Sequence, residues 1–373
     1  MQNILKFTLP ELTHEIKKLG FPGFRAQQIF QSIHKNGITS IDDILLINKE
    51  LKEKLKQSFI IDYVKPVHTT DSTIYDTHKF LFQVHDEVKG TKYKLETVLI
   101  SEENRNTVCV STQVGCNVGC EFCATGKMGF LKNLDPAQII SQVYQVKKIS
   151  GKEITNIVFM GMGEPFLNYD NMFKSIMILT DEQGMDLSSK RITVSTVGFT
   201  GKIRKFADDL MMDENKKMKN VKLALSLHST DSGIREKIIP TASKNPLKEI
   251  YAELSYFYSK TGNKVTYEYI FFGGLNDTDN DINRLTKLSK MVPSNINVIP
   301  FHPIHFELDG PLKIFNGIQD KDISLLKTKL NDFIEKLRFN KVIVNLRTSS
   351  GIDINAACGQ LAVLNQDKVS DPD

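Results

Sequence analysis

The sequence has no Trp, few Cys and no long apolar stretch, since its 373 residues include only five Cys. No apolar run reaches the roughly 18 residues of a transmembrane helix, and the first residues lack the charged-then-apolar layout of a signal peptide. Five Cys are too few for a disulfide scaffold, so we expect them to be ligands or catalytic thiols, which need a reducing compartment. A cytoplasmic protein without membrane contact is therefore expected.

A strong charge of either sign is also missing, because 48 Lys and Arg stand against 44 Asp and Glu, for a net charge of +4. This mild excess permits nucleic-acid binding without arguing for it. The 40% of apolar residues can fill a large core, which favours one large α/β domain with a smaller one. No heptad pattern indicates a dimer, so we expect a monomer.

Three of the five Cys form one short run. Cys116, Cys120 and Cys123 have the spacing Cys-x3-Cys-x2-Cys, and three such thiolates can bind three irons of a [4Fe-4S] cluster, leaving the fourth iron open to a small molecule. A structural zinc site would need a fourth ligand, usually from a second hook, and a ferredoxin-like carrier would need a fourth nearby Cys. The remaining two, Cys109 and Cys358, provide neither, so the run favours catalysis.

The sequence pattern of the N-terminal part of the chain predicts helices. Apolar spacing predicts short helices over 9–19, 24–35 and 41–59, broken by Gly and Pro. Two strands are predicted at 78–84 and 93–100, joined by a polar turn. Together they indicate a helical lobe linked to the rest by a hairpin.

Beyond Cys109, β-branched or apolar runs alternate with stretches long enough for a helix. These runs lie at 154–160, 191–197, 221–227, 264–272, 296–301 and 341–347. With a strand before the Cys run there are seven candidates, close to the six parallel strands of an incomplete (β/α)6 barrel, and an α/β fold of this kind is predicted. The expected division is a helical N-terminal domain (1–75), a linking hairpin (76–104), the barrel (105–361) and a polar tail (362–373).

Polar and Gly-rich segments follow three of these strands, where a parallel barrel gathers its ligands. They are the segment 161–165 (GMGEP), Ser195 and the segment 226–228 (SLH). The glycines allow a close approach of backbone to a ligand. Each segment alone is a weak signal, since a tight turn or a locally bonded hydroxyl explains it as well.

The Cys run is identified as the cluster signature of the radical S-adenosylmethionine (SAM) superfamily. The segments around Cys109 and Cys358, with GMGEPFLN at 161–168 and SLHS at 226–229, resemble the RlmN/Cfr family of RNA adenine methyltransferases from about Phe24 to Leu361. The resemblance implies an incomplete barrel, a [4Fe-4S] cluster and SAM bound to its open iron. It also implies SAM contacts at Gly163, Glu164, Ser195, Ser226, Leu227 and His228.

One position departs from the family pattern. His302 stands where the family usually has an Asn that contacts SAM, and a ring nitrogen could still make that hydrogen bond. The following stretch, 305–319, looks longer than the common pattern and receives no role.

The resemblance also implies the chemistry. Cys358 takes a methyl group from one SAM and becomes S-methylcysteine; a second SAM is cleaved, and a methylene radical on that sulfur adds to adenine. Attack of Cys109 on the Cys358 sulfur then releases the methylated RNA and leaves a disulfide. Glu96 matches the position that the family uses as candidate proton acceptor. A solvated or salt-bridged carboxylate without a catalytic role is an equally open interpretation.

Val114 and Pro165 lean toward the RlmN branch, which methylates carbon 2 of an adenine in 23S rRNA and in tRNA. The Cfr branch, which methylates carbon 8 and confers antibiotic resistance, is the alternative. A non-catalytic iron-sulfur RNA-binding protein and a radical SAM activase are further alternatives, and the paired Cys109 and Cys358 argue against both. A flavodoxin- or ferredoxin-type electron donor is the expected protein partner.

Two groups of lysines could contact the RNA. The first lies in the N-terminal part and comprises Lys49, Lys52, Lys54, Lys56 and Lys65. The second comprises Lys216, Lys217, Lys219 and Lys222. A solvated face explains the first group as well as RNA does, and the second group better.

Overall fold

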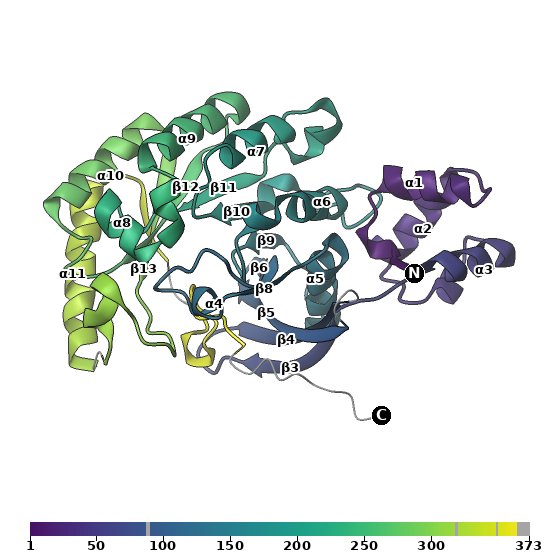
Figure 1. Cartoon of the computed structure of the whole chain (residues 1–373), viewed down its shortest axis with the longest axis horizontal. Coiled ribbons are helices and arrows are strands. Elements are labelled where there is room, and N and C mark those ends of the chain that lie inside the picture. The colour runs from purple at the N-terminus through teal and green to yellow at the C-terminus, as the bar shows by residue number, and fades with distance from the viewer. Residues whose placement is uncertain (87–89, 318–319, 348–349, 364–373) are drawn as a thin grey trace.

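One sheet of ten strands organises the chain from residue 65 onward (Figure 1). The computed structural model describes residues 1–86, 90–317, 320–347 and 350–363. Along the sheet the order is β14-β13-β12-β11-β10-β9-β6-β5-β4-β3. The strands are β3 (Lys65–Asp71), β4 (Thr77–Asp86), β5 (Thr91–Glu102), β6 (Arg105–Cys109), β9 (Asn156–Phe159), β10 (Ile192–Thr196), β11 (Lys222–Ser226), β12 (Val265–Phe271), β13 (Ser294–Pro300) and β14 (Val344–Leu346).

The strands from β6 to β14 run parallel, and in the described part of the chain no pairing joins β14 to the opposite edge. The barrel is therefore incomplete, which confirms the expected fold class. Because parallel neighbours need a crossover, helices return the chain across one face of the sheet. These helices are α5 (Pro136–Ser150), α6 (Tyr169–Leu179), α7 (Lys202–Leu210), α9 (Leu247–Thr261), α10 (Asp279–Met291) and α11 (Asp320–Phe339).

Local sequence defines the ends of α5. Asp135 accepts a hydrogen bond from the backbone of Gln138, whose side chain bonds back to the Asp135 backbone, and Pro136 occupies the first helical position. Gly151 ends the helix with a φ of 67°, in the left-handed region that glycine tolerates.

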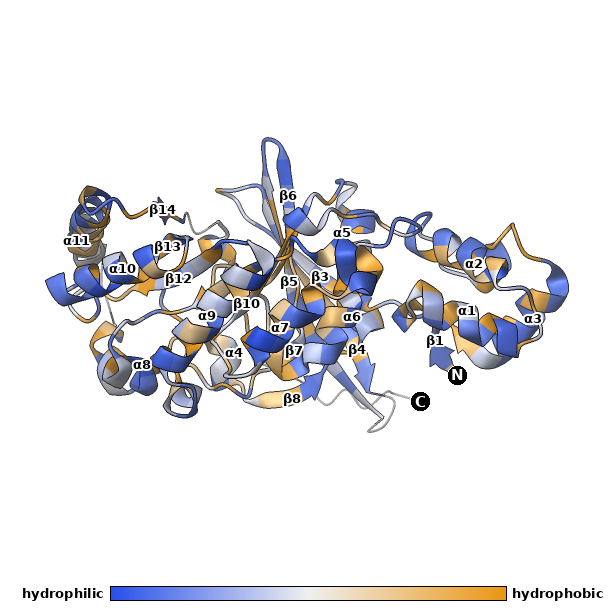
Figure 2. Cartoon of the chain, turned by 90° about the horizontal axis from the view of Figure 1, so that it is seen from above, coloured by the Kyte–Doolittle hydropathy of each residue, from blue (hydrophilic) through white to orange (hydrophobic). Residues whose placement is uncertain are grey.

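The three N-terminal helices form a separate lobe at one end of the elongated molecule (Figures 1 and 2). They are α1 (Leu9–Lys18), α2 (Phe24–His34) and α3 (Lys49–Ser58). The first two match the predicted helices, but the third prediction was too long, because residues 41–43 form a separate short turn of 3-10 helix. A small ribbon of β1 (Gln2–Asn3) and β2 (Phe59–Ile60) ties the start of the lobe to its end.

The predicted hairpin forms as β4 and β5, and a further strand, β3, precedes it. All three are antiparallel extensions of the barrel sheet, because β5 also pairs with β6 through Val98 and Cys109. No pattern in the sequence predicts β3, since an edge strand that is mostly exposed needs no apolar alternation.

A second, smaller core surrounds the Cys run. The short helix α8 (Ser232–Ile238) contributes Ile238 to it, and the short helix α4 (Ala124–Lys127) directly follows its residues Phe122 and Cys123. The Cys run itself lies between the two strands of an antiparallel ribbon, β7 (Gln113–Gly115) and β8 (Phe130–Asn133). The apolar side chains of this core include Val118, Phe122, Ile238, Ile239, Phe272, Leu308, Leu312 and Phe315. The unassigned stretch 305–319 thus packs against the Cys run, with 318–319 outside the described residues.

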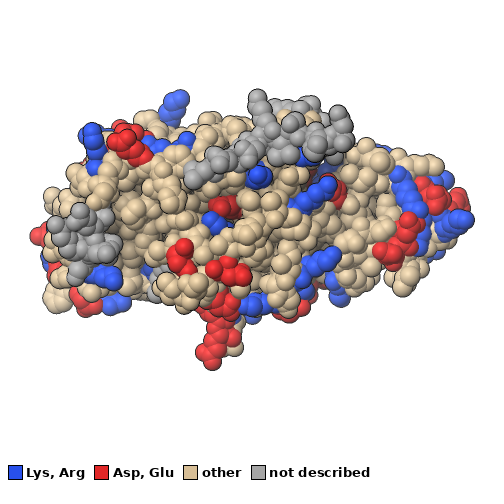
Figure 3. Space-filling model, turned by 90° about the horizontal axis from the view of Figure 1, so that it is seen from below, with Lys and Arg blue, Asp and Glu red and all other residues tan. Residues whose placement is uncertain are grey.

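Short 3-10 helices complete the described chain. They are η1 (Ile4–Lys6), η2 (Ile41–Asp43), η3 (Pro165–Asn168), η4 (Ser189–Arg191), η5 (Asp213–Met218), η6 (Pro240–Lys244), η7 (Gly310–Phe315) and η8 (Ile352–Ile354). Of the helices described, none has both the length and the apolar composition needed to cross a bilayer. On the face shown in Figure 3, Lys and Arg are interspersed with Asp and Glu.

Candidate active site

The Cys run lies on the loop between β7 and β8. Cys116 and Cys120 are buried and Cys123 is partly buried, and all three are free thiols. Gly115 closes the loop with a φ of 72°, and a Cβ there would lie 1.8 Å from the carbonyl oxygen of Gly129. Only glycine fits this approach, which holds the thiols at one end of the sheet.

The donor set fits an iron-sulfur cluster better than a single ion. Within the described ranges, no three His, Cys, Asp or Glu side chains are arranged to hold one metal ion, as zinc would require. In a cluster each thiolate binds a different iron, so the ligands need not converge on one point. Burial raises the pKa of Cys116 to about 12, and a bound iron supplies the positive charge that favours the thiolate.

A cavity of about 130 Å³ lies beside these thiols, at the carboxyl ends of the parallel strands. The structure brings most of the predicted site residues together around it. Those that line it are Cys116, Cys120, Cys123, Gly163, Glu164, Ser195, Ser226, His228 and Cys358.

The GMGE segment presents a buried carboxylate to this cavity. Gly163 has a φ of 96°, and a Cβ on it would lie 2.5 Å from the side chain of Gln113. Glu164 accepts hydrogen bonds of 3.0 Å from the backbone N–H groups of Phe166 and Val197. Burial raises the pKa of Glu164 to about 7, so a ligand that donates hydrogen bonds or carries positive charge would favour its ionised form.

A buried imidazole also lines the cavity. The backbone N–H of Ile270 donates to His228 Nδ1 at 3.1 Å, so the neutral ring carries its proton on Nε2. Burial lowers the pKa of His228 to about 3, which keeps the ring neutral near pH 7. Its φ of 54° is unusual for a non-glycine residue and is typical of a functional site. Nearby, the Ser195 and Ser226 hydroxyls are 3.3 Å apart.

Two predicted SAM contacts are not among the described lining residues of this cavity. Leu227 is fully buried in the main core, where its N–H donates to the Glu268 carbonyl at 3.0 Å and its carbonyl accepts from Arg235 at 3.1 Å. His302 is partly buried just beyond β13, and burial lowers its pKa. Both contacts stay predictions.

The remaining two Cys share a second cavity, of about 90 Å³, that adjoins the first. Cys109 and Cys358 both line it, and Cys123 and Cys358 line both cavities. Burial, together with the nearby Cys358, raises the pKa of Cys109 to about 12.

Two hydrogen bonds hold the Cys358 loop against the Cys run. The Ala124 N–H donates to the Gly359 carbonyl at 2.7 Å, and the Thr125 hydroxyl donates to the Leu361 carbonyl at 2.5 Å. Figure 1 shows α4 and the yellow C-terminal loop side by side. These bonds place Cys358 where the two cavities meet.

Two family models match this chain. The radical SAM superfamily model matches residues 110–286, and the model of the ribosomal RNA large subunit methyltransferase N-terminal domain matches residues 2–61. A protein of Dictyoglomus turgidum, named "probable dual-specificity RNA methyltransferase RlmN", is 39% identical over 98% of this chain and 97% of its own length. The chain belongs to the RlmN family.

Other relatives agree. The protein of the same name from Thermotoga neapolitana is 37% identical over 100% of both chains. The crystal structure of a radical SAM methyltransferase from Sphaerobacter thermophilus is 33% identical, with a TM-score of 0.82, and covers 97% of this chain and 99% of that one. The RlmN-family resemblance, the fold and the methyltransferase class are therefore confirmed, and radical SAM enzymes use a [4Fe-4S] cluster and SAM.

Arg347 is a site residue that the sequence reasoning missed. In this RlmN-family chain its guanidinium lines both cavities and lies 3.4 Å from the carboxylate of Glu268, which also accepts from Asn297 at 2.9 Å. The proximity of Cys358 raises the pKa of Arg347. Glu268 could have been found from the sequence, because it is a charged residue inside the otherwise apolar run 264–272.

Glu96 lies in a buried ion pair. Its carboxylate is 3.0 Å from Lys79 Nζ and accepts from the Ala362 N–H at 2.9 Å. Burial raises the pKa of Glu96, and Lys79 opposes that rise. Glu96 therefore ties β5 to the segment after Cys358, and its role as proton acceptor stays a prediction.

We expect SAM to bind more weakly as the pH falls below about 7, because protonation removes the Glu164 carboxylate that would accept from the SAM amino group. The loss approaches tenfold per pH unit well below that pKa. Glu164→Gln should lower the affinity about tenfold or more at pH 8 and flatten this dependence. Equilibrium dialysis with cluster-loaded protein measures both, and an unchanged pH profile in the variant would contradict the assignment.

Proposed function

We propose that this chain methylates carbon 2 of an adenine in 23S rRNA and in tRNA. The observation that carries the proposal is the pair Cys109 and Cys358 in one cavity, which adjoins the cavity lined by the Cys run. Neither an iron-sulfur RNA-binding protein nor an activase needs such a pair. The relatives' names, which specify dual-specificity RNA methyltransferases, support the RNA substrate.

When bound, the cluster and SAM supply the methyl group and the one-electron chemistry that an electron-poor ring carbon requires. Cys358 carries the methyl group, so the carbon that is transferred to adenine is held on a side chain of fixed position. The guanidinium of Arg347 lies beside Cys358 and also lines both cavities, so it is placed to orient groups that bind next to the methyl carrier. Of two SAM molecules per turnover, one methylates Cys358.

Cys109 then releases the product. Its sulfur loses its proton and attacks the Cys358 sulfur. The carbon–sulfur bond to RNA breaks, and the methylene carbon keeps the bonding electron pair and takes up a proton to become the methyl group. The two sulfurs are left as a disulfide, which must accept two electrons before the next round. Glu96 is the proposed acceptor of the proton lost from the ring, and Lys79 would stabilise its charged form. A disulfide that must be reduced in each cycle suits the cytoplasm.

Carbon 2 is favoured over carbon 8 by the RlmN-type residues Val114 and Pro165, which are both buried, and Pro165 also lines the cavity beside the Cys run. A Cfr-type reaction at carbon 8 is the second candidate. We also propose a flavodoxin- or ferredoxin-type electron donor, since SAM cleavage needs single electrons, and a monomeric enzyme.

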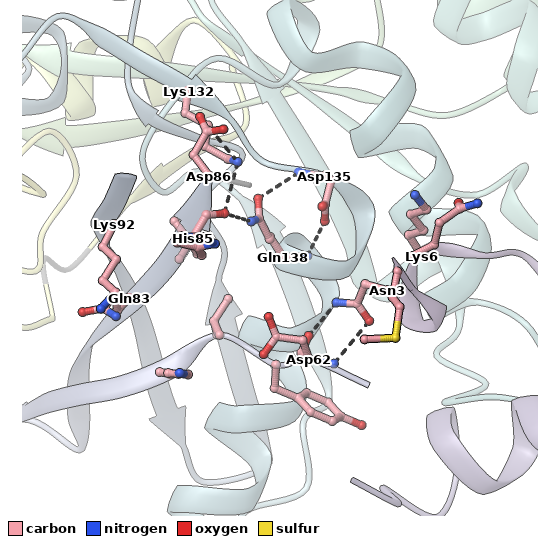
Figure 4. A pocket seen from close by; sticks show the side chains of 16 residues that line it. Asn3, Lys6, Asp62, Gln83, His85, Asp86, Lys92, Lys132, Asp135 and Gln138 are labelled. Carbon is pink, nitrogen blue, oxygen red and sulfur yellow. Dashed lines mark hydrogen bonds and ion pairs between the residues drawn. The ribbon is translucent and has the colours of Figure 1, made fainter. Parts of the chain in front are cut away.

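RNA contact is proposed for the groove in Figure 4, a cavity of about 470 Å³ between the N-terminal lobe, the β4–β5 hairpin and the start of α5. Its basic side chains are those of Lys6, Lys65, Lys92 and Lys132, against three acids, Asp62, Asp86 and Asp135. Asp86 lies 3.8 Å from Lys132, so this pair adds no net charge, and Asp135 caps α5. The excess of cations suits a phosphodiester backbone.

Lysines of α3 are poorer candidates. Lys56 lies 2.5 Å from Asp42, and Lys54 lies 3.7 Å from Glu50. In the second predicted group, Lys216 and Lys217 likewise pair with nearby acids. Acidic side chains of the protein therefore partly neutralise these lysines, as is usual on a solvent-exposed helix face.

Replacing Cys358 with Ala should abolish methyladenosine while the cluster remains, because the methyl carrier is lost. Cys109→Ala should instead trap a covalent protein–RNA adduct. Nucleoside mass spectrometry, iron content and denaturing gels read these outcomes, with the wild-type chain as reference. Full methylation by Cys358→Ala would overturn the mechanism, and 8-methyladenosine from the wild type would move the chain to the Cfr-type reaction.

The double variant Lys6→Glu/Lys65→Glu should weaken RNA binding and reduce the slope of log affinity against log salt by roughly 0.7 to 0.9 per lost phosphate contact, the range between single strands and a duplex. Fluorescence anisotropy with a tRNA substrate measures this. The matched control, Lys17→Glu/Lys35→Glu, changes the same charge at exposed positions of the N-terminal lobe outside the groove and should have a smaller effect. Equal losses in both variants would argue against the groove.

A further inference from the structure

Arg235 is a buried arginine, and two of its three side-chain nitrogens donate hydrogen bonds to the protein. Its side chain is 1% exposed, and it donates through Nε to the Leu227 carbonyl at 3.1 Å and through Nη2 to the carbonyls of Val197 at 2.5 Å and Ser226 at 3.3 Å. Nη1 is buried without a hydrogen-bond partner among the described residues. Buried polar groups are normally paired, so this N–H indicates a group that the protein itself does not provide.

The charge of Arg235 is also uncompensated. No Asp or Glu in the described part of the chain forms an ion pair with it, and the groups that bear on its charge are the Cys120 thiol and the Tyr251 hydroxyl. Burial lowers the pKa of Arg235 to about 10, which leaves the guanidinium charged at neutral pH. A buried, unpaired cation is costly unless an anion lies close to it.

Its helix is fastened to the Cys run. The Glu121 N–H, next to Cys120, donates to the carbonyl of Ile238 on α8 at 3.0 Å. Ile238 also packs with Val118 and Cys120 in the second core. Two carbonyls that Arg235 holds, those of Val197 and Ser226, belong to residues that line the cavity beside the Cys run. Arg235 therefore lies behind the wall of that cavity, on the side of Cys120.

We infer that Arg235 is a positioning residue that sets the reduction potential of the [4Fe-4S] cluster. A cluster with three thiolate ligands is an anion, and it gains a further negative charge when an electron donor reduces it. A fixed cation nearby, in surroundings of low polarity, stabilises the reduced form more than the oxidised form and raises the potential. The inference does not depend on which RNA carbon is methylated.

The test replaces the charge and the hydrogen bonds separately. Arg235→Met removes both, whereas Arg235→Lys keeps the charge and loses the three-way hydrogen bonding. The measurement is a redox titration of the anaerobically reconstituted full chain, followed by electron paramagnetic resonance. At the wild-type midpoint, the ratio of reduced to oxidised cluster should fall about tenfold in Arg235→Met, a shift of about 59 mV to more negative potential. Arg235→Lys should stay near the wild type.

Lys237→Met is the matched control, because it removes an exposed positive charge from the same helix and should leave the potential unchanged. The inference is overturned if Arg235→Met has the wild-type potential, or if Arg235→Lys shifts as far as Arg235→Met. Should Arg235→Met fail to fold, citrulline at position 235 removes the charge but keeps the shape, the Nε–H and one terminal NH2 group, with an oxygen in place of the other terminal nitrogen. An unshifted potential with citrulline would equally refute the role of charge.

Discussion

The site depends on the hydrogen bonds that join the loop of the Cys run to the C-terminal loop. The bonds from Ala124 to Gly359 and from Thr125 to Leu361 connect segments more than 200 residues apart in sequence. Because the chain leaves both β6 and β14 at the carboxyl ends of the parallel strands, short bonds suffice to bring Cys358 beside Cys123. Glu96 reinforces the arrangement by holding Ala362 from β5.

Buried charge is the second organising feature. Glu164 and Arg235 have no oppositely charged side chain of the described chain paired with them, while Arg347 and Glu268 pair across the cavity. In an apolar shell, unpaired charges are tolerated only where a ligand completes them. Their placement around one cavity explains how this chain could bind an anionic cluster and a cationic cofactor side by side.

The N-terminal lobe and the barrel are joined through the sheet itself. The strands β3, β4 and β5 extend the barrel sheet and form one wall of the groove in Figure 4, and the N-terminal segment forms another. The groove therefore holds its lysines at a defined distance from the Cys run, which a flexible linker between the lobe and the barrel would not do.

The sequence by itself determined the family and most of the fold, and it predicts the cluster ligands, because metal-ligand spacing and strand–helix alternation are local patterns. It also placed Glu164, Ser226 and His228 at strand ends. Only the tertiary structure decided that Leu227 is in the core and that Arg235 and Arg347 lie beside the thiols, since burial and pairing arise from segments distant in sequence. The strand β3 was hidden for a related reason: its pairing with β4, rather than any apolar alternation of its own, makes it a strand.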